Sequence, residues 1–134
     1  MNIILDTHYA LWCLYDDEKI SGKAYDIIAD PNNDIYVSSA SIIEISNKHI
    51  KKPEKMTISG EEFYHNCLEN DFYILPVQAK IIHEYEDLKL KSEAYVNKDP
   101  FDRILLAQAK HYKYMLLTHD HCMEYYNEPY TIII

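Results

Sequence analysis

Short apolar runs alternate with longer segments of helical periodicity along the whole chain. Five runs are rich in β-branched or aromatic residues and too short for helices, which is typical of buried strands. These runs cover residues 3–5, 35–38, 72–75, 114–117 and 130–134. Helical spacing predicts helices at 7–15, at 21–30, from a cap at Ser39 or Ser41 to about 49, at 59–69 and at 77–90. Strands that alternate with helices predict a parallel sheet covered on both faces.

One further helix has the clearest start signal in the chain. Asp99-Pro100-Phe101-Asp102-Arg103 precedes the apolar stretch 104–109. Proline is favoured in the first helical turn, so Asp102 is predicted to lie in that turn. There the helix dipole stabilises a carboxylate whose side chain can face a ligand. The polar residues 91–98 predict a loop that leads into this helix.

The size of the chain predicts a single domain. A length of 134 residues is enough for one sizeable core and too short for two, so the domain is expected to cover 1–134. The first apolar run reaches Asp6 too soon for a signal peptide, and no run has membrane-spanning length. Cys13, Cys67 and Cys122 show no metal-ligand spacing, which indicates reduced thiols. We therefore expect a cytoplasmic protein without a membrane segment.

The charge balance bears on binding partners. A formal net charge of −9 argues against long-range attraction to nucleic acid, so contact with a phosphate backbone would need a local basic patch or bound cations. The one concentrated basic stretch consists of Lys48, His49, Lys51, Lys52 and Lys55. Such a run is usually a solvated helix end. Its alternative role is to contact a phosphate backbone, chiefly through Lys48, Lys51 and Lys52.

Four acids are predicted to meet at one edge of the sheet. Asp6 and Asp120 each end a predicted strand, Asp102 begins a helix, and Glu44 lies near the start of its own helix. Ligands of open parallel sheets bind at the carboxyl edge of the strands. Singly each acid is ambiguous, since Asp6 suits a helix N-cap and Glu44 suits solvent. Four carboxylates together repel one another unless a hard divalent cation offsets the repulsion, and Mg²⁺ or Mn²⁺ held in this way can activate water.

The motifs taken together resemble a known family. The stretches are Leu5-Asp6-Thr7-His8 with Leu11-Trp12, Ser38-Ser39-Ala40-Ser41 before Glu44-Ile45 and Lys48, Asp99-Pro100-Phe101-Asp102-Arg103 with Ala107-Gln108-Ala109, and Leu117-Thr118-His119-Asp120. In this order they cover nearly the whole chain. The chain thus resembles the PIN-domain ribonucleases, in particular the VapC-type toxins of bacterial toxin–antitoxin pairs.

The resemblance implies a fold and a reaction. The fold is an α/β/α sandwich with a central five-stranded parallel sheet, and the reaction is Mg²⁺- or Mn²⁺-dependent endonuclease cleavage of RNA. Asp6 and Asp102 correspond to the principal metal ligands, with Glu44 and Asp120 binding a second ion or acting through water. Thr7 and Thr118 match hydroxyls that hold the acids or the attacking water. Asp99 is expected to support the metal ligands, and Arg103 to pair with an acid or a substrate phosphate.

The resemblance also implies partners. Such toxins are held by a small antitoxin that places a basic segment in the active-site groove, and homodimers are common. Tyr125, Tyr126 and Tyr130 are candidates for a dimer or antitoxin surface, with packing in the domain as the default role. One departure is that Val96-Asn97-Lys98 stand before the central motif, where related sequences often carry histidine. This departure concerns a loop contact and leaves the acidic cluster intact.

Other α/β classes fit less well. Gly22 and Gly60 are the only glycines, so the glycine-rich fingerprints of dinucleotide-binding and P-loop enzymes are absent. A haloacid-dehalogenase-like enzyme would need an acid at position 8, which is histidine, and the late Thr/Ser–Lys arrangement of receiver domains is not convincing. The alternative that stays open is a non-cleaving PIN-like module that binds RNA or a protein partner.

Overall fold

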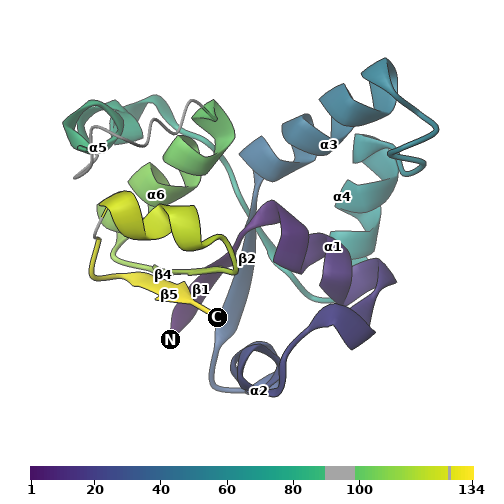
Figure 1. Cartoon of the computed structure of the whole chain (residues 1–134), viewed down its shortest axis with the longest axis horizontal. Coiled ribbons are helices and arrows are strands. Elements are labelled where there is room, and N and C mark those ends of the chain that lie inside the picture. The colour runs from purple at the N-terminus through teal and green to yellow at the C-terminus, as the bar shows by residue number, and fades with distance from the viewer. Residues whose placement is uncertain (90–98, 127) are drawn as a thin grey trace.

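A parallel sheet forms the centre of the molecule. The computed structural model describes residues 1–89, 99–126 and 128–134, and within them the strand order is β3-β2-β1-β4-β5 (Figure 1). All neighbouring strands run parallel, which confirms the predicted sheet. The strands are β1 Asn2–Leu5, β2 Asp34–Ser38, β3 Tyr73–Leu75, β4 Met115–Thr118 and β5 Thr131–Ile133.

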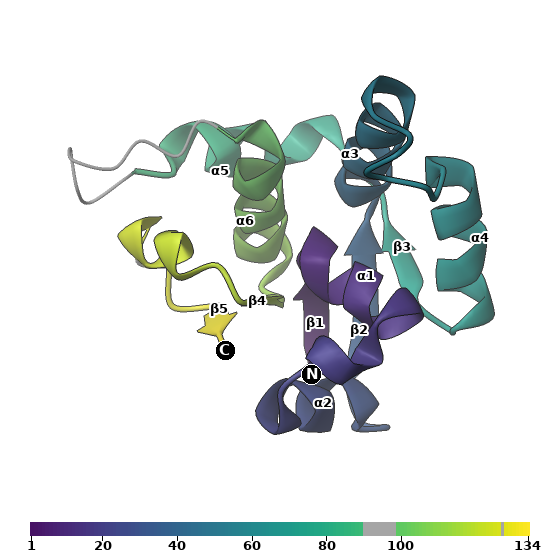
Figure 2. The same cartoon turned by 45° about the vertical axis from the view of Figure 1, so that its right-hand side comes forward.

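Helices cover both faces of this sheet. The α-helices are α1 Thr7–Tyr15, α2 Gly22–Ala29, α3 Ser39–Lys51, α4 Gly60–Glu69, α5 Ile82–Asp87 and α6 Pro100–Tyr112. Short 3₁₀ helices are η1 Asp17–Lys19, η2 Ala79–Ile81 and η3 His121–Tyr126. In Figure 2, α1, α2 and α4 lie on one side of the sheet and α5 and α6 on the other. No helix in the described part of the chain is long and apolar enough to cross a bilayer.

The alternation of side chains along β1 explains the three layers. Successive residues of a strand point to opposite faces, and a parallel sheet buries both. Ile3 and Leu5 pack in the core under α1, α2 and α4, whereas Ile4 packs in the core under α6 and η3. Residues 3–5 are all apolar because each faces one of two buried cores. The predicted α/β/α sandwich is confirmed.

Two sequence-based predictions of helix boundaries are wrong. The predicted helix 77–90 is shorter in the described residues, because it divides into η2 and α5 and the chain is extended at Leu88. The Arg103 side chain donates hydrogen bonds to the carbonyl oxygens of Tyr85 and Leu88, so these groups are satisfied where the helix stops. Residue 90 and the predicted loop 91–98 lie outside the described residues.

The second correction concerns the cap of α3. Ser38 is the N-cap, because its Oγ accepts a hydrogen bond of 3.1 Å from the amide of Ala40. Ser39 instead accepts a hydrogen bond from the amide of Val77, and Ser41 is buried beside Thr7. Three serines in four residues made the cap ambiguous in the sequence, since each can satisfy a free helical amide.

The close approach of α3 and α4 depends on Gly60. A methyl group at this position would overlap Ser46 Oγ and lie 3.0 Å from the carbonyl oxygen of Ile42. We expect Gly60→Ala to lower the free energy of unfolding by about 1–3 kcal/mol, which is the usual effect of overpacking. Urea unfolding of both variants measures this. Gly22→Ala is the matched control, because in the described structure an added Cβ at Gly22 has no atom within 4 Å. Equal unfolding midpoints for the two variants would contradict the prediction.

Candidate active site

The order of the strands places a crevice at the carboxyl edge of the sheet. From β1, the chain continues to β2 on one side, while β4 lies on the other side of β1. Parallel sheets bind ligands where the strand order reverses in this way, because the loops after the two strands diverge. Asp6 directly follows β1 and Asp120 lies two residues after β4. Both acids therefore lie at the switch point.

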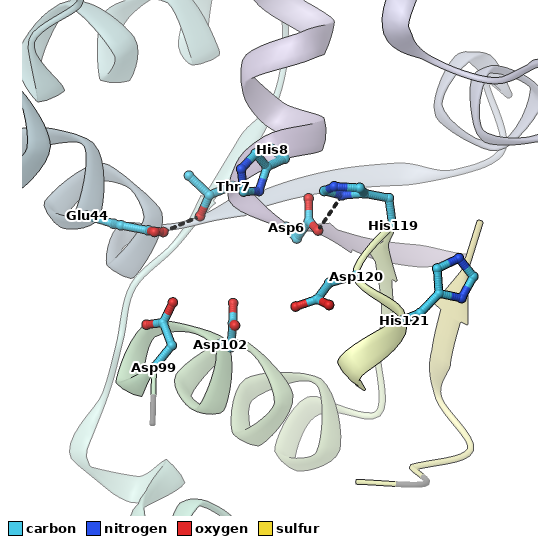
Figure 3. A pocket seen from close by; sticks show the side chains of 9 residues that line it. All are labelled: Asp6, Thr7, His8, Glu44, Asp99, Asp102, His119, Asp120 and His121. Atoms are coloured by element: carbon cyan, nitrogen blue, oxygen red, sulfur yellow. Dashed lines mark hydrogen bonds and ion pairs between the residues drawn. The ribbon is translucent and has the colours of Figure 1, made fainter. Parts of the chain in front are cut away.

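A cavity of about 320 Å³ occupies this crevice (Figure 3). It is lined by acids from four parts of the chain, together with one threonine and three histidines. The lining residues are Asp6, Thr7, His8, Glu44, Asp99, Asp102, His119, Asp120 and His121. The structure thus brings together all five predicted acids and Thr7, and Figure 3 shows the acids directed toward one space.

Asp6 combines the two roles that the sequence left open. Its Oδ1 caps α1 by accepting a hydrogen bond of 2.8 Å from the amide of Tyr9. Its Oδ2 accepts a hydrogen bond of 2.6 Å from the hydroxyl of Thr118. The residue is only 4 % exposed, so the cap and the hydroxyl fix its carboxylate at the floor of the cavity. Burial and the negative charge of Asp6 both raise the pKa of the neighbouring Tyr9, whose hydroxyl donates to the Ile134 carbonyl oxygen.

Glu44 is held from both sides, rather than facing solvent. The Thr7 hydroxyl donates a hydrogen bond of 2.7 Å to Glu44 Oε1 and shares another, of 2.9 Å, with Ser41 Oγ. The Lys48 ammonium lies 3.2 Å from Glu44 Oε2, one helical turn along α3. The side chain of Glu44 is only 13 % exposed, so its charge is offset by these polar partners.

Asp99 and Asp102 lie at the start of α6, as the sequence predicted. Asp99 is the N-cap, because its Oδ1 accepts a hydrogen bond of 3.0 Å from the amide of Phe101, and Pro100 begins the helix. Asp102 is in the first turn. Both carboxylates are therefore near the positive end of the helix dipole, which lowers the free energy of a negative charge there.

Thr118 links two of the acids. Besides donating to Asp6, its Oγ1 accepts a hydrogen bond of 3.1 Å from the amide of Asp120. Asp120 Oδ1 in turn accepts a hydrogen bond from the amide of Cys122, which begins to turn the chain into η3. Thr118 is completely buried, so it acts beneath the cavity without lining it.

The donor set fits a divalent cation. Five carboxylates share this one cavity, and among its described lining residues there is no lysine or arginine. Carboxylate oxygens are the preferred ligands of Mg²⁺ and Mn²⁺, and a bound ion would relieve the repulsion among them.

The three histidines of the cavity are not among the site residues predicted from sequence. The available signal was position, since His8 follows Asp6-Thr7 and His119 stands between Thr118 and Asp120. Their proximity depends on the pairing of β1 with β4, which the order of residues does not reveal.

The predicted basic residues lie next to the acidic cavity. Lys48, Lys51 and Lys52 line a groove near the end of α3 together with Lys55 and Met56. A second, smaller depression is lined by Glu44, Lys48 and Lys51 of α3 and by Asp99 and Phe101 at the start of α6. Because the depressions share these residues, a continuous strip of surface leads from the lysines to the acids.

Two predicted residues have other roles in the structure. The Arg103 guanidinium binds the carbonyl oxygens of Tyr85 and Leu88 and stacks 5.1 Å from the Tyr85 ring, so it joins α5 to α6 and does not line the acidic cavity. Tyr126 is buried beneath α6 and cannot form a surface for a partner. Tyr130 packs partly buried against the same core, and the side chain of Tyr125 lies outside the described structure.

Comparison with known proteins yields one family and similar structures. The model of the PIN domain family matches residues 3–128. A chain in the crystal structure of VapBC2 from Rickettsia felis, bound to a DNA fragment from their promoter, superimposes with a TM-score of 0.70 at 18% sequence identity. The match covers 100% of this chain and 98% of the other. The search of curated proteins gave no match.

Proposed function

Because the chain belongs to the PIN domain family, we propose that it is a metal-dependent endoribonuclease, and specifically a VapC-type toxin. The observation that carries the proposal is the convergence of five carboxylates on one cavity at the switch point of the sheet. Each acid comes from a stretch that matches the family's motifs. The similarity to a VapBC2 chain along its whole length supports the toxin assignment.

The acids would hold Mg²⁺ or Mn²⁺. We assign Asp6 and Asp102 as the principal ligands, and Glu44 and Asp120 as ligands of a second ion or of metal-bound water. When bound, such an ion lowers the pKa of a water molecule and stabilises charge on the oxygens of a phosphodiester. This assignment uses two acids on rigid elements, since Asp6 caps α1 and Asp102 is in the first turn of α6.

The surrounding residues would keep this arrangement in place for the reaction. Thr118 fixes one oxygen of Asp6, and Thr7 fixes one oxygen of Glu44. Both hydroxyls donate, so each carboxylate retains its charge and a defined orientation. Asp99 supports Asp102 by capping the helix on which Asp102 stands. Such preorganisation removes the need to reorient the acids as charge develops on the phosphate.

The lysine groove gives RNA a path to the acids. Lys48, Lys51 and Lys52 attract the phosphate backbone, while the acidic cavity needs a cation before a phosphate can enter it. The strip through Lys48 and Lys51 leads toward Glu44 and Asp99. A single strand lying along it would place one phosphate near Asp6 and Asp102 and the next ones near the lysines.

We expect Lys51→Glu to weaken binding of single-stranded RNA about tenfold and to reduce the slope of log affinity against log salt by about 0.7, the value for one lost phosphate contact. Fluorescence anisotropy in the Asp102→Asn background measures binding without cleavage. Lys23→Glu is the charge-matched control, because Lys23 is exposed on α2 at the opposite end of the strands (Figure 1). If both variants bind RNA equally, the lysine groove is not the path of the substrate.

Partners follow from the same site. We propose that a small antitoxin covers the cavity with a basic segment, since a net charge of −9 and five clustered acids favour a cationic partner. Co-expression with the protein encoded beside this chain tests this proposal, and separate elution of the two proteins at low salt would contradict it.

A homodimer is also expected from the family. Light scattering of the isolated chain tests this expectation, and a monomeric mass would overturn it.

The central experiment is cleavage of bulk RNA by the purified chain without an antitoxin. We expect fragments with Mg²⁺ or Mn²⁺ and none with EDTA. Single-stranded DNA of the same length tests whether the 2′-hydroxyl is recognised. A folded, metal-loaded chain that binds RNA but cuts none of several RNA classes would identify the non-cleaving module instead.

A further inference from the structure

Two histidines converge on the carboxylate of Asp6. His8 lies in the first turn of α1 and His119 directly after β4, so the two come from opposite ends of the sequence. One ligand atom of each histidine and one of Asp6 all lie within 4.8 Å of one another. Figure 3 shows both rings beside Asp6, whereas the ring of His121 is directed away from it.

His119 is held in place by its neighbours. Its Nδ1 lies 3.6 Å from Asp6 Oδ2, which is too long for a hydrogen bond. This nitrogen is shielded from solvent and has no hydrogen-bond partner among the described residues. The ring packs 4.7 Å from Trp12 and 5.1 Å from His8, measured between ring centroids. The ring nitrogen that faces the Asp6 carboxylate is therefore buried and makes no hydrogen bond to it.

The separation of these atoms suits a shared metal ion. Two ligand atoms about 2.1 Å from one metal at the tetrahedral angle are about 3.4 Å apart. The distance of 3.6 Å between His119 Nδ1 and Asp6 Oδ2 is close to this value. Asp6 is already oriented by the amide of Tyr9 and the hydroxyl of Thr118, which is how ligating carboxylates are usually fixed.

We propose that Asp6, His8 and His119 form a nitrogen-containing position for a transition-metal cation such as Co²⁺ or Zn²⁺, beside the part of the cavity lined by oxygen. Imidazole is a good ligand for these ions, whereas Mg²⁺ prefers oxygen and retains its water. The proposal rests on the proposed nuclease site, with which it shares Asp6, and it adds that the site selects transition metals over Mg²⁺.

The competing explanation is a simple ion pair between a charged His119 and Asp6. The ion pair explains the position of His119 but not why His8 also lies close to Asp6. A metal position accounts for the approach of both rings to the same carboxylate, and for the lining of acids that surrounds them. The two explanations differ in whether His8 contributes to metal binding.

Titration with Co²⁺ alone tests the proposal. Calorimetry and the visible absorption of the bound ion monitor the titration. We expect His8→Ala and His119→Ala each to weaken Co²⁺ binding at least about tenfold, since even the loss of an outer-shell partner typically costs that much, and to change the absorption spectrum. Mg²⁺ affinity should change less than about twofold, because Mg²⁺ would use the carboxylates. His121→Ala is the matched control, since His121 lines the cavity outside the three-residue group.

The outcomes separate this inference from the proposed function. Unchanged Co²⁺ affinity and spectrum in His8→Ala and His119→Ala would overturn the metal position, even if the chain cleaves RNA with Mg²⁺. Histidine-dependent Co²⁺ binding by a chain that cleaves no RNA would support the metal position and count against the nuclease. His8 is exposed, so its variant should fold even if loss of His119 disturbs the packing around Trp12.

Discussion

Asp102→Asn is expected to lower the rate of metal-dependent RNA cleavage by at least about 100-fold, because it removes a charged ligand from the proposed metal site. Asparagine has nearly the same shape and keeps the first turn of α6 polar, so the fold should be retained. Asp99, the N-cap, and Pro100 are unchanged. The measurement is the initial rate of cleavage with saturating Mg²⁺ or Mn²⁺, together with urea unfolding of both proteins.

Asp26→Asn is the control for this variant. Asp26 is exposed on α2, at the opposite end of the strands from the cavity (Figure 1), and its substitution removes the same charge. It should leave cleavage within about twofold of the parent. Expression of Asp102→Asn in cells should also relieve any growth inhibition that the parent causes. If Asp102→Asn cleaves RNA as fast as the parent, the metal site assigned here is wrong.

The convergence of the acids could be predicted from the sequence, because all strands of a parallel sheet end at the same edge. The apolar runs are short and helices separate most of them, which favours strands that share one direction. Asp6 directly follows one of these runs, Asp120 comes three residues after another, and Pro100 marks the start of the helix that carries Asp102. Local patterns therefore determined which end of each element the acids occupy.

The histidines and Arg103 depended on neighbours that local patterns do not reveal. His8 meets His119 only because β1 pairs with β4, with Leu5 opposite Leu117. Arg103 belongs to a motif rich in acids, yet its guanidinium reaches back to the carbonyl oxygens of Tyr85 in α5 and of Leu88, its C-cap. The predicted helix 77–90 is too long for a related reason. Its apolar spacing continues past α5, whereas the helix ends where the carbonyl oxygens of Tyr85 and Leu88 accept hydrogen bonds from Arg103.

Asp6 illustrates how two explanations of one residue can both be correct. As an N-cap it needs one oxygen near the amide of Tyr9, which leaves the other oxygen to face Thr118 and the cavity. The cap makes the carboxylate rigid, and rigidity is what a metal ligand requires. The structural role therefore prepares the proposed catalytic one.

Thr118→Val is expected to lower the free energy of unfolding by about 2–4 kcal/mol and RNA cleavage by about 10–100-fold. Valine keeps the shape of threonine in the completely buried end of β4 but removes the hydroxyl. Asp6 Oδ2 then loses its 2.6 Å hydrogen bond, and the amide of Asp120 loses its acceptor. Both losses leave polar groups of the site without a partner in a place with little water.

Two matched variants separate the hydroxyl from the change in side chain. Thr118→Ser keeps the hydroxyl and should retain most of the cleavage rate. Thr131→Val makes the same substitution in β5, where the hydroxyl has no hydrogen-bond partner among the described residues, so stability should stay equal or rise. Equal losses from Thr118→Val and Thr131→Val would mean that valine itself disturbs the sheet. If only Thr118→Val loses both stability and cleavage, the Thr118 hydroxyl both stabilises the fold and holds Asp6 in the position that cleavage needs.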